Sequence, residues 1–407
     1  MFKKLLILVV SCAGLVCLGV GLKLGWSRLT KPVQKVRITV FIHGTIGGAL
    51  NIFNTQQYAS EKFNNASATA RAVKKIRSVE LLNYDQIFGA LGLHEFNAAE
   101  TPVWYAARHV IPAYEDVAQC VGRSSDVTKD LIFGWTGFLH HGARKEAGYE
   151  LYTALCDYRD RMRAKYGVDP DITVIGHSHG GNVGLWLAQA EKEGKRGLQV
   201  DSLIMLGSPM QKEMACCIES PLFRTIVLCH SDGDAIQRID YISNKERKSH
   251  QRMSDVADIK AFIQQNPALR RHDVACMINN SARHITHINM WLVGRSTPVL
   301  KAFDVVPLVV YLPALMNCLD QHPHESSVEW YMQDSGESCV VSLHPKNLLC
   351  QTCKDSACID GTALHGTVSG WDTMMKSQWQ LPDDKSRHVL FNKKNVRALK
   401  NLVCALF

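Results

Sequence analysis

Two phosphate-binding signatures are missing from this 407-residue sequence, which contains neither a G-x-G-x-x-G pattern nor a Walker motif with its lysine. Internal repeats and low-complexity tracts are also missing. Hydrophobic residues make up 46% of the chain and charged residues 21%, which is ordinary for a folded globular protein. The composition therefore excludes a disordered chain, a collagen-like fibre and a polytopic membrane protein.

Acidic residues are absent from both ends of the chain. Residues 1–37 hold seven Lys or Arg and residues 385–407 hold six, and neither segment has an Asp or Glu. The remaining 33 basic and 38 acidic residues give the middle of the chain a formal charge of −5, although the whole chain carries +8. We expect no nucleic-acid-binding face on the main domain, and basic ends of this kind are typical of membrane flanks.

The run from Leu5 to Leu22 contains no charged residue and is just long enough to cross a bilayer as a helix. Its length favours a retained membrane anchor. A cleaved signal peptide is the alternative, with Gly19–Gly21 as a weak cleavage site, and a lipobox-like stretch ending at Cys12 makes a lipoprotein a third possibility. Basic residues flank both sides of the run, so the sequence does not predict which side of the membrane the domain faces.

The 14 cysteines do not settle the compartment. Most are scattered on apolar stretches, as expected of buried free thiols. The C-terminal group is denser, and it predicts either a disulfide patch or, less favoured, a zinc site completed by His344 or His365. This group consists of Cys339, Cys350, Cys353 and Cys358.

Short apolar segments alternate with helical stretches along the central part of the chain. The segments predicted as strands are 35–42, 130–134, 171–175, 202–206, 224–229 and 285–293. Residues 143–165 and 181–194 are predicted as helices, the first from an apolar stripe at three- and four-residue steps. This alternation predicts an α/β fold with a doubly wound, mostly parallel sheet.

Two insertions interrupt the alternation. About 85 residues separate His43 from the second predicted strand, and residues 305–316 are strongly apolar and contain two prolines. Both are candidates for a cap over the catalytic edge, and core packing is the alternative for the second. We divide the chain into an N-terminal segment at 1–34, a main domain at 35–332 and a Cys-bearing extension at 333–407, which ends in a basic amphipathic helix.

The segment Gly176-His-Ser178-His-Gly180-Gly181 matches G-x-S-x-G and lies between a predicted strand and a predicted helix. A turn this sharp needs glycines on both sides, and it lifts the Ser178 hydroxyl above the sheet edge at a helix N-terminus. Ser178 is therefore the candidate nucleophile. Acyl transfer also needs two backbone N–H donors for an oxyanion, and we expect them from His179 and from Thr45 in the glycine-rich loop that follows the first strand.

The glycine-rich loop, the elbow around Ser178 and the order of strands resemble the α/β-hydrolase superfamily, with lipase- and esterase-like members in particular, over residues 36–330. The resemblance implies a triad in the chain order Ser, acid, His. The acid is expected after the strand at 224–229, where Asp234 is favoured and Asp232 is the alternative. For the histidine, His324 is favoured, His365 is next, and His287 and His284 are less favoured.

The sequence thus predicts a serine esterase or lipase that cleaves acyl-lipid or other apolar esters through an acyl-enzyme, with no metal or organic cofactor. The expected partners are a small-molecule or lipid ester and a membrane reached through the N-terminal segment. A membrane-tethered, non-catalytic interaction protein on the same scaffold is the alternative from another class, and a thioesterase or amidase with the same triad is a further one.

Overall fold

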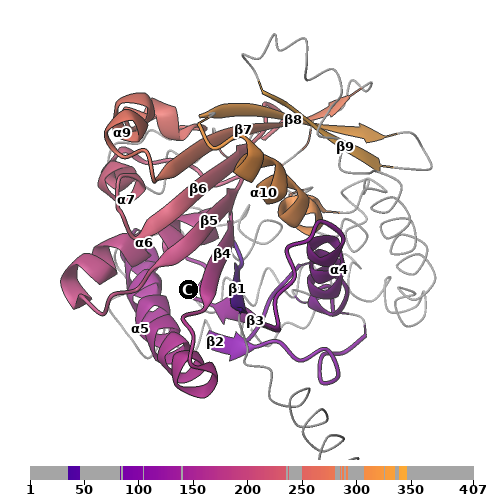
Figure 1. Cartoon of the computed structure of the whole chain (residues 1–407), viewed down its shortest axis with the longest axis vertical. Helices are drawn as coiled ribbons and strands as arrows, with labels where there is room; N and C mark the ends of the chain where they lie inside the picture. The colour runs from indigo at the N-terminus through magenta and orange to yellow at the C-terminus, as the bar shows by residue number, and fades with distance from the viewer. Residues whose placement is uncertain are drawn as a thin grey trace, which may run out of the picture.

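The computed structural model describes most of the central chain, and the text below concerns these residues only (Figure 1). They are residues 35–45, 83, 86–103, 105–138, 141–234, 237, 250–279, 285, 287, 290–291, 307–324, 326–334 and 339–345. Their strands form a single sheet with the order β2-β3-β1-β4-β5-β6-β7-β8-β9. All neighbours in it pair in parallel except β2 with β3 and β8 with β9, at the two edges. The predicted α/β architecture with a mostly parallel sheet is confirmed.

The central strands are short, buried and rich in β-branched residues, as expected of strands that are covered on both faces. The strands are β1 (Val36–Ile42), β2 (Gly92–Glu95), β3 (Val127–Gly134), β4 (Asp171–His177), β5 (Val200–Leu206), β6 (Phe223–His230), β7 (Arg270–Asn279), β8 (Ser327–Asp334) and β9 (Cys339–Pro345). Five of the six predicted strands coincide with β1, β3, β4, β5 and β6.

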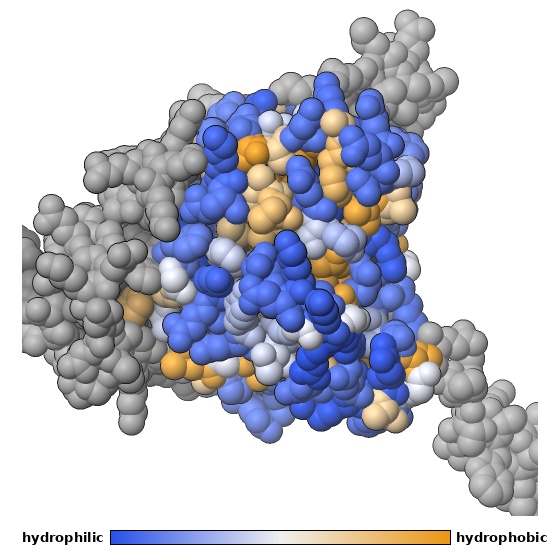
Figure 2. Space-filling model, turned by 90° about the vertical axis from the view of Figure 1, so that its left-hand side faces the viewer, coloured by the Kyte–Doolittle hydropathy of each residue, from blue (hydrophilic) through white to orange (hydrophobic). Residues whose placement is uncertain are grey.

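Helices cover both faces of this sheet (Figure 1). On one face lie α5 (His141–Tyr166), α6 (His179–Gly194), α7 (Ala215–Ile218) and α9 (Ile259–Gln265), with the short 3-10 turns η3 (Lys212–Met214) and η4 (Met253–Asp255). The other face is covered by α4 (Ala107–Cys120), η5 (Leu308–Tyr311) and α10 (Leu312–Gln321). Both predicted helices are confirmed as α5 and α6. Figure 2 shows a largely hydrophilic surface with separate apolar spots on the side of the molecule that it presents.

The chain leaves β1 and β4 in opposite directions across the sheet. From β1 it goes on to β2 and β3 at one side, and from β4 it goes on to β5 at the other, although β1 and β4 are neighbours. In open parallel sheets such a switch point leaves a crevice at the carboxyl ends of the two strands. His43 follows β1 and Ser178 follows β4, so the sheet brings the loop with the predicted donor Thr45 and the predicted nucleophile to the same edge.

The predicted strand at 285–293 is not a strand where the structure describes it, because Ile285, His287, Met290 and Trp291 lie in turns or irregular backbone. The strand that pairs with β6 is β7, which the apolar pattern missed because it begins with buried polar side chains. Arg271 donates to the carbonyl oxygens of Ile218 (2.6 Å) and Ser220 (2.9 Å), and burial lowers its pKa to about 10. The buried guanidinium of Arg271 is thus compensated by carbonyl oxygens of another segment, and the strand tolerates it.

Residues beyond the expected end of the main domain belong to the same sheet. The predicted boundary at 332 falls inside β8, and β9 continues the sheet as far as Pro345. The apolar segment at 305–316 contributes η5 and the start of α10, whose side chains are buried in the core beside α4. For the part of this segment that the structure describes, core packing rather than a cap is what is found.

Several predictions concern residues outside those that the structure describes. The N-terminal segment, Cys350, Cys353, Cys358 and the basic C-terminal helix are among them. In the described ranges, no helix combines the length and the apolar character needed to cross a bilayer.

Candidate functional site

Ser178 occupies the sharp turn between β4 and α6. Its backbone angles of φ 52° and ψ −129° lie in a region that residues with a side chain rarely adopt. The turn is held in place because the Ser178 N–H donates to the Leu206 carbonyl of β5 (2.8 Å) and its carbonyl accepts from Gly181 (3.0 Å). Strain of this kind persists only where surrounding contacts fix it, which fits the predicted elbow.

The glycines around Ser178 are required by the close approach of backbone. A Cβ on Gly176 would lie 2.4 Å from the Gly181 nitrogen, and one on Gly180 would lie 2.5 Å from the His43 carbonyl oxygen. Real Cβ atoms do not come this close to backbone. The G-x-S-x-G spacing is thus explained by packing at the turn and against the loop that follows β1.

The loop after β1 passes directly beside the serine. A Cβ on Gly44 would lie 2.9 Å from the Ser178 Cβ. The His43 ring fixes this loop: Nδ1 donates to the Gly44 carbonyl (2.7 Å), and Nε2 accepts from the Trp135 backbone N–H (3.3 Å). The Trp135 indole donates in turn to the His43 carbonyl (2.8 Å). Thr45 follows immediately, so the structure brings the predicted donor loop and the elbow together.

Asp234 and His287 form a buried pair at the same edge of the sheet. The His287 Nδ1 and the Asp234 Oδ2 are 2.7 Å apart, and both residues are more than 90% buried. A carboxylate can only accept, so Nδ1 carries the proton and a neutral ring keeps its lone pair on Nε2. The other carboxylate oxygen accepts from the Gln237 backbone N–H (3.1 Å). This arrangement fixes the carboxylate and the tautomer of the imidazole.

Gly207 connects this pair to the elbow. It follows Leu206, whose carbonyl accepts from Ser178, and its own N–H donates to the Cys229 carbonyl of β6 (2.9 Å). Its φ of +60° is left-handed, and a Cβ at this position would lie 2.9 Å from both the Asp234 Oδ2 and the His287 Nδ1. The loop after β5 therefore leaves room for the acid–histidine pair only because residue 207 is glycine.

The structure places His324, the favoured histidine, far from the elbow. His324 is exposed and lies just before β8, at the amino end of a parallel strand, whereas Ser178 follows the carboxyl end of β4. The two residues are therefore at opposite edges of the sheet. His287, the less favoured alternative, makes the contact with Asp234, while His284 and His365 lie outside the described residues. Asp232 is exposed, unlike Asp234.

His177, the residue before Ser178, packs against the histidine of the pair. The His177 Nε2 is 3.0 Å from the His287 carbonyl oxygen, the two rings are 4.6 Å apart, and the His177 ring stacks on Trp291 at 5.6 Å with an angle of 3°. Burial, together with the nearby imidazole of His287, lowers the pKa of His177 well below its usual 6.5. His177 is therefore neutral at pH 7.

His179, the residue after Ser178, is held by its side chain. The His179 Nδ1 accepts from Arg144 Nη1 (3.0 Å) and lies 3.2 Å from Asn182 Nδ2. Arg144 is fully buried near the start of α5, and its other terminal nitrogen donates to Gln211 (3.0 Å). These contacts fix the first turn of α6, where the His179 backbone N–H is the second predicted oxyanion donor.

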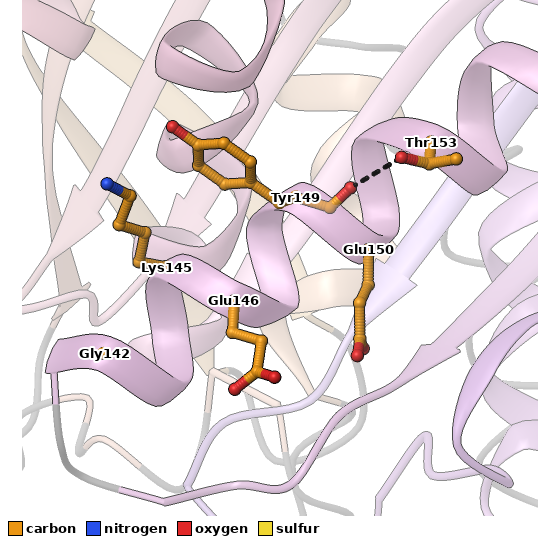
Figure 3. Close-up of a pocket in the computed structure, with 6 residues that line it drawn as sticks. All are labelled: Gly142, Lys145, Glu146, Tyr149, Glu150 and Thr153. Atoms are coloured by element: carbon orange, nitrogen blue, oxygen red, sulfur yellow. Dashed lines mark hydrogen bonds between the residues drawn. The ribbon is translucent and has the colours of Figure 1, made fainter. Parts of the chain in front are cut away.

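A depression of about 550 Å³ lies elsewhere, along the outer side of α5 (Figure 3). One helix supplies its whole lining: Gly142, Lys145, Glu146, Tyr149, Glu150 and Thr153. Lys145 lies over the Tyr149 ring at 5.4 Å, and the two carboxylates point away from them (Figure 3). The depression is open and holds no acid–base pair comparable to Asp234 and His287. Among the described residues, no cluster of His, Cys, Asp and Glu has a metal-binding arrangement.

No family model matches the chain, and no curated protein matches its sequence. Among solved structures, the chain is similar to an esterase of Pyrobaculum calidifontis in a monoclinic form, at 11% identity and a TM-score of 0.25, over 74% of this chain and 68% of that one. It is also similar to the product of the gene lin2722 from Listeria innocua, at 13% identity and a TM-score of 0.23, over 74% and 84%. These likenesses are distant.

Proposed function

We propose that the chain is a serine hydrolase of the α/β-hydrolase type that cleaves carboxylic esters with Ser178, Asp234 and His287. The observation that carries the proposal is the 2.7 Å Asp234–His287 pair, buried at the same sheet edge as a serine in a strained elbow. A fold that only needed a tight turn would have no use for a buried, tautomer-fixed imidazole beside it. The Ser, acid, His order along the chain agrees with the resemblance found in the sequence.

The chemistry follows from the positions of the groups. The His287 Nε2 accepts the proton of Ser178 as its oxygen attacks the ester carbonyl, and Asp234 stabilises the imidazolium that forms. The Thr45 and His179 backbone N–H groups bind the oxyanion, which forms at the positive end of the α6 dipole. The imidazolium then protonates the leaving alcohol. Water, deprotonated by the same ring, releases the acid from the acyl-enzyme.

We infer an apolar ester, such as an acyl lipid, as the substrate class, and a membrane as the place of action. The support is the charge-free run from Leu5 to Leu22 with its basic flanks, which would bring the domain to a lipid surface either as an anchor or during export. Thioesters and amides react through the same kind of tetrahedral intermediate, so the test below includes them as substrates.

The test measures hydrolysis of p-nitrophenyl esters of increasing acyl length by the full-length protein in detergent, next to Ser178→Ala. We expect turnover that rises with acyl length in the wild type and is lost in the variant. Equal rates for the two proteins at every length would overturn the proposal and favour a non-catalytic scaffold. Faster turnover of thioester or amide analogues would keep the mechanism and change the substrate class.

A further inference from the structure

His177 makes a connection that the proposed reaction does not use. Its Nε2 lies 3.0 Å from a carbonyl oxygen, and because a carbonyl only accepts, this nitrogen carries the proton and donates. The acceptor belongs to His287, the residue proposed as the base. One side chain at the elbow therefore contacts the backbone of the residue that must reach the elbow.

The His287 backbone depends on such contacts more than the backbone of Ser178 or Asp234 does. Ser178 directly follows β4, and Asp234 follows β6 after three residues. His287 is eight residues beyond the end of β7, in a turn and not in a strand. Its ring is fixed by Asp234, but a ring can keep that bond while its backbone shifts, and the direction of Nε2 then changes. The hydrogen bond from His177 to the His287 carbonyl fixes that backbone as well.

We propose that His177 is a positioning residue, which holds the His287 backbone so that the imidazole meets Ser178 in the reactive orientation. The inference rests on the function proposed above. Two independent contacts carry it: the hydrogen bond to the His287 carbonyl, and the stacking of the His177 ring on Trp291, four residues further along the same segment. His177 thus connects the elbow to both ends of the turn that carries His287.

The ring suits this task because it stays neutral. Two other imidazoles disfavour a charged His177: that of His287, at 4.6 Å between ring centroids, and that of His43. When His287 takes the serine proton, a neutral neighbour avoids repulsion between two imidazolium rings. The donor to the His287 carbonyl is therefore present before and during proton transfer.

The experiment compares two amides at position 177 in the full-length protein. His177→Gln places an N–H group near the former Nε2, and the shorter His177→Asn does not reach it. We expect His177→Asn to lower kcat by about 10- to 100-fold, as for a displacement of the base of up to about 1 Å. KM should change little, and His177→Gln should recover most of the loss. Equal losses in the two variants, or none in His177→Asn, would overturn the proposal.

A double-mutant cycle separates positioning from a general effect on the turn. In a His287→Ala background, His177→Asn should cost nothing further in the rate of Ser178 labelling by a fluorophosphonate, because the residue acts through His287. A full additional loss would show that His177 supports Ser178 itself and would refute the inference.

A measurement on the wild-type protein avoids variants that fail to fold. Ring-nitrogen NMR, with His177 assigned through its contact with the Trp291 indole, should show a neutral, Nε2-protonated tautomer throughout the pH range in which activity rises. A proton on Nδ1, or a charged ring at neutral pH, would refute the inference whatever the activity. Failure of Ser178 to react at all, with the predicted tautomer present, would instead refute the proposed function.

Discussion

Replacing Gly207 by alanine tests the packing of the acid–histidine pair with a single methyl group. The new Cβ would lie 2.9 Å from both the Asp234 Oδ2 and the His287 Nδ1, and 3.2 Å from the Met290 sulfur. One of these groups must move by several tenths of an ångström, which breaks or lengthens the 2.7 Å hydrogen bond. The change therefore acts on the geometry of the pair without replacing either of its side chains.

Two effects should lower the unfolding free energy of Gly207→Ala. A left-handed φ of +60° costs an alanine about 1–2 kcal/mol, and overpacking of a buried site adds about 1–3 kcal/mol. Gly197→Ala is a matched control, because Gly197 also has a left-handed φ, of +66°, but nothing lies within 4 Å of its Cβ position. The control should lose about 1–2 kcal/mol of unfolding free energy and keep its activity. The difference between the two variants isolates the contact with the pair.

The assay combines urea unfolding with ester hydrolysis on both variants. Displacement of His287 by a few tenths of an ångström to 1 Å should lower kcat of Gly207→Ala by about 10- to 100-fold, which corresponds to about 1.4–2.7 kcal/mol in the barrier. The reasoning is refuted if Gly207→Ala matches Gly197→Ala in both stability and kcat, since the pair would then not lie where the structure places it.

Three further predictions concern single side chains. Asp234→Asn should lower kcat by about 10³–10⁴-fold with little change in KM, because an amide stabilises the wrong tautomer of His287; a loss below tenfold in steady-state kinetics would exclude Asp234 as the acid. Burial raises the pKa of Asp130 from 3.8 to about 8, so the folded state keeps a proton that the unfolded state releases. The unfolding free energy should therefore fall as the pH rises from about 4 to 8, and Asp130→Asn should flatten that slope in urea titrations; identical slopes would contradict it. Gly180→Ala, whose Cβ would meet the His43 carbonyl oxygen at 2.5 Å, should lower the unfolding free energy by about 1–3 kcal/mol and reduce activity, and unchanged thermal unfolding would speak against the close contact.

The parts of the site that follow a regular strand were predictable from the sequence. Ser178 and the loop that contains Thr45 each follow a buried β-branched run, and such runs predict where the carboxyl edge of a parallel sheet lies. The spacing of glycines around Ser178 indicates the close backbone contacts at this turn. Asp234 was favoured over Asp232 on the resemblance, which implies an acid after the strand at 224–229.

The histidine was harder to predict because β7, the strand that precedes it, lacks the apolar pattern of a buried strand. Near its start β7 carries the buried polar side chains of Arg271 and His272, and the hydrogen bonds that compensate Arg271 come from another segment, which no local pattern reveals. The apolar pattern around Trp291 predicted a strand, although Trp291 packs on the core from a turn. β8 is absent from the predicted strands, and the alternate burial of Val328 and Trp330 shows its period of two. One misplaced strand moved the expected histidine from His287 to the far edge of the sheet.

The central claim is that Ser178 is a nucleophile activated by His287, and covalent labelling tests it most directly. The full-length protein is incubated with a fluorophosphonate, digested, and the modified residue is located by mass spectrometry. We predict one adduct, on Ser178, that forms much more slowly in His287→Ala and at the wild-type rate in His324→Ala. An unmodified Ser178 in folded protein, or labelling that depends on His324 and not on His287, would contradict it.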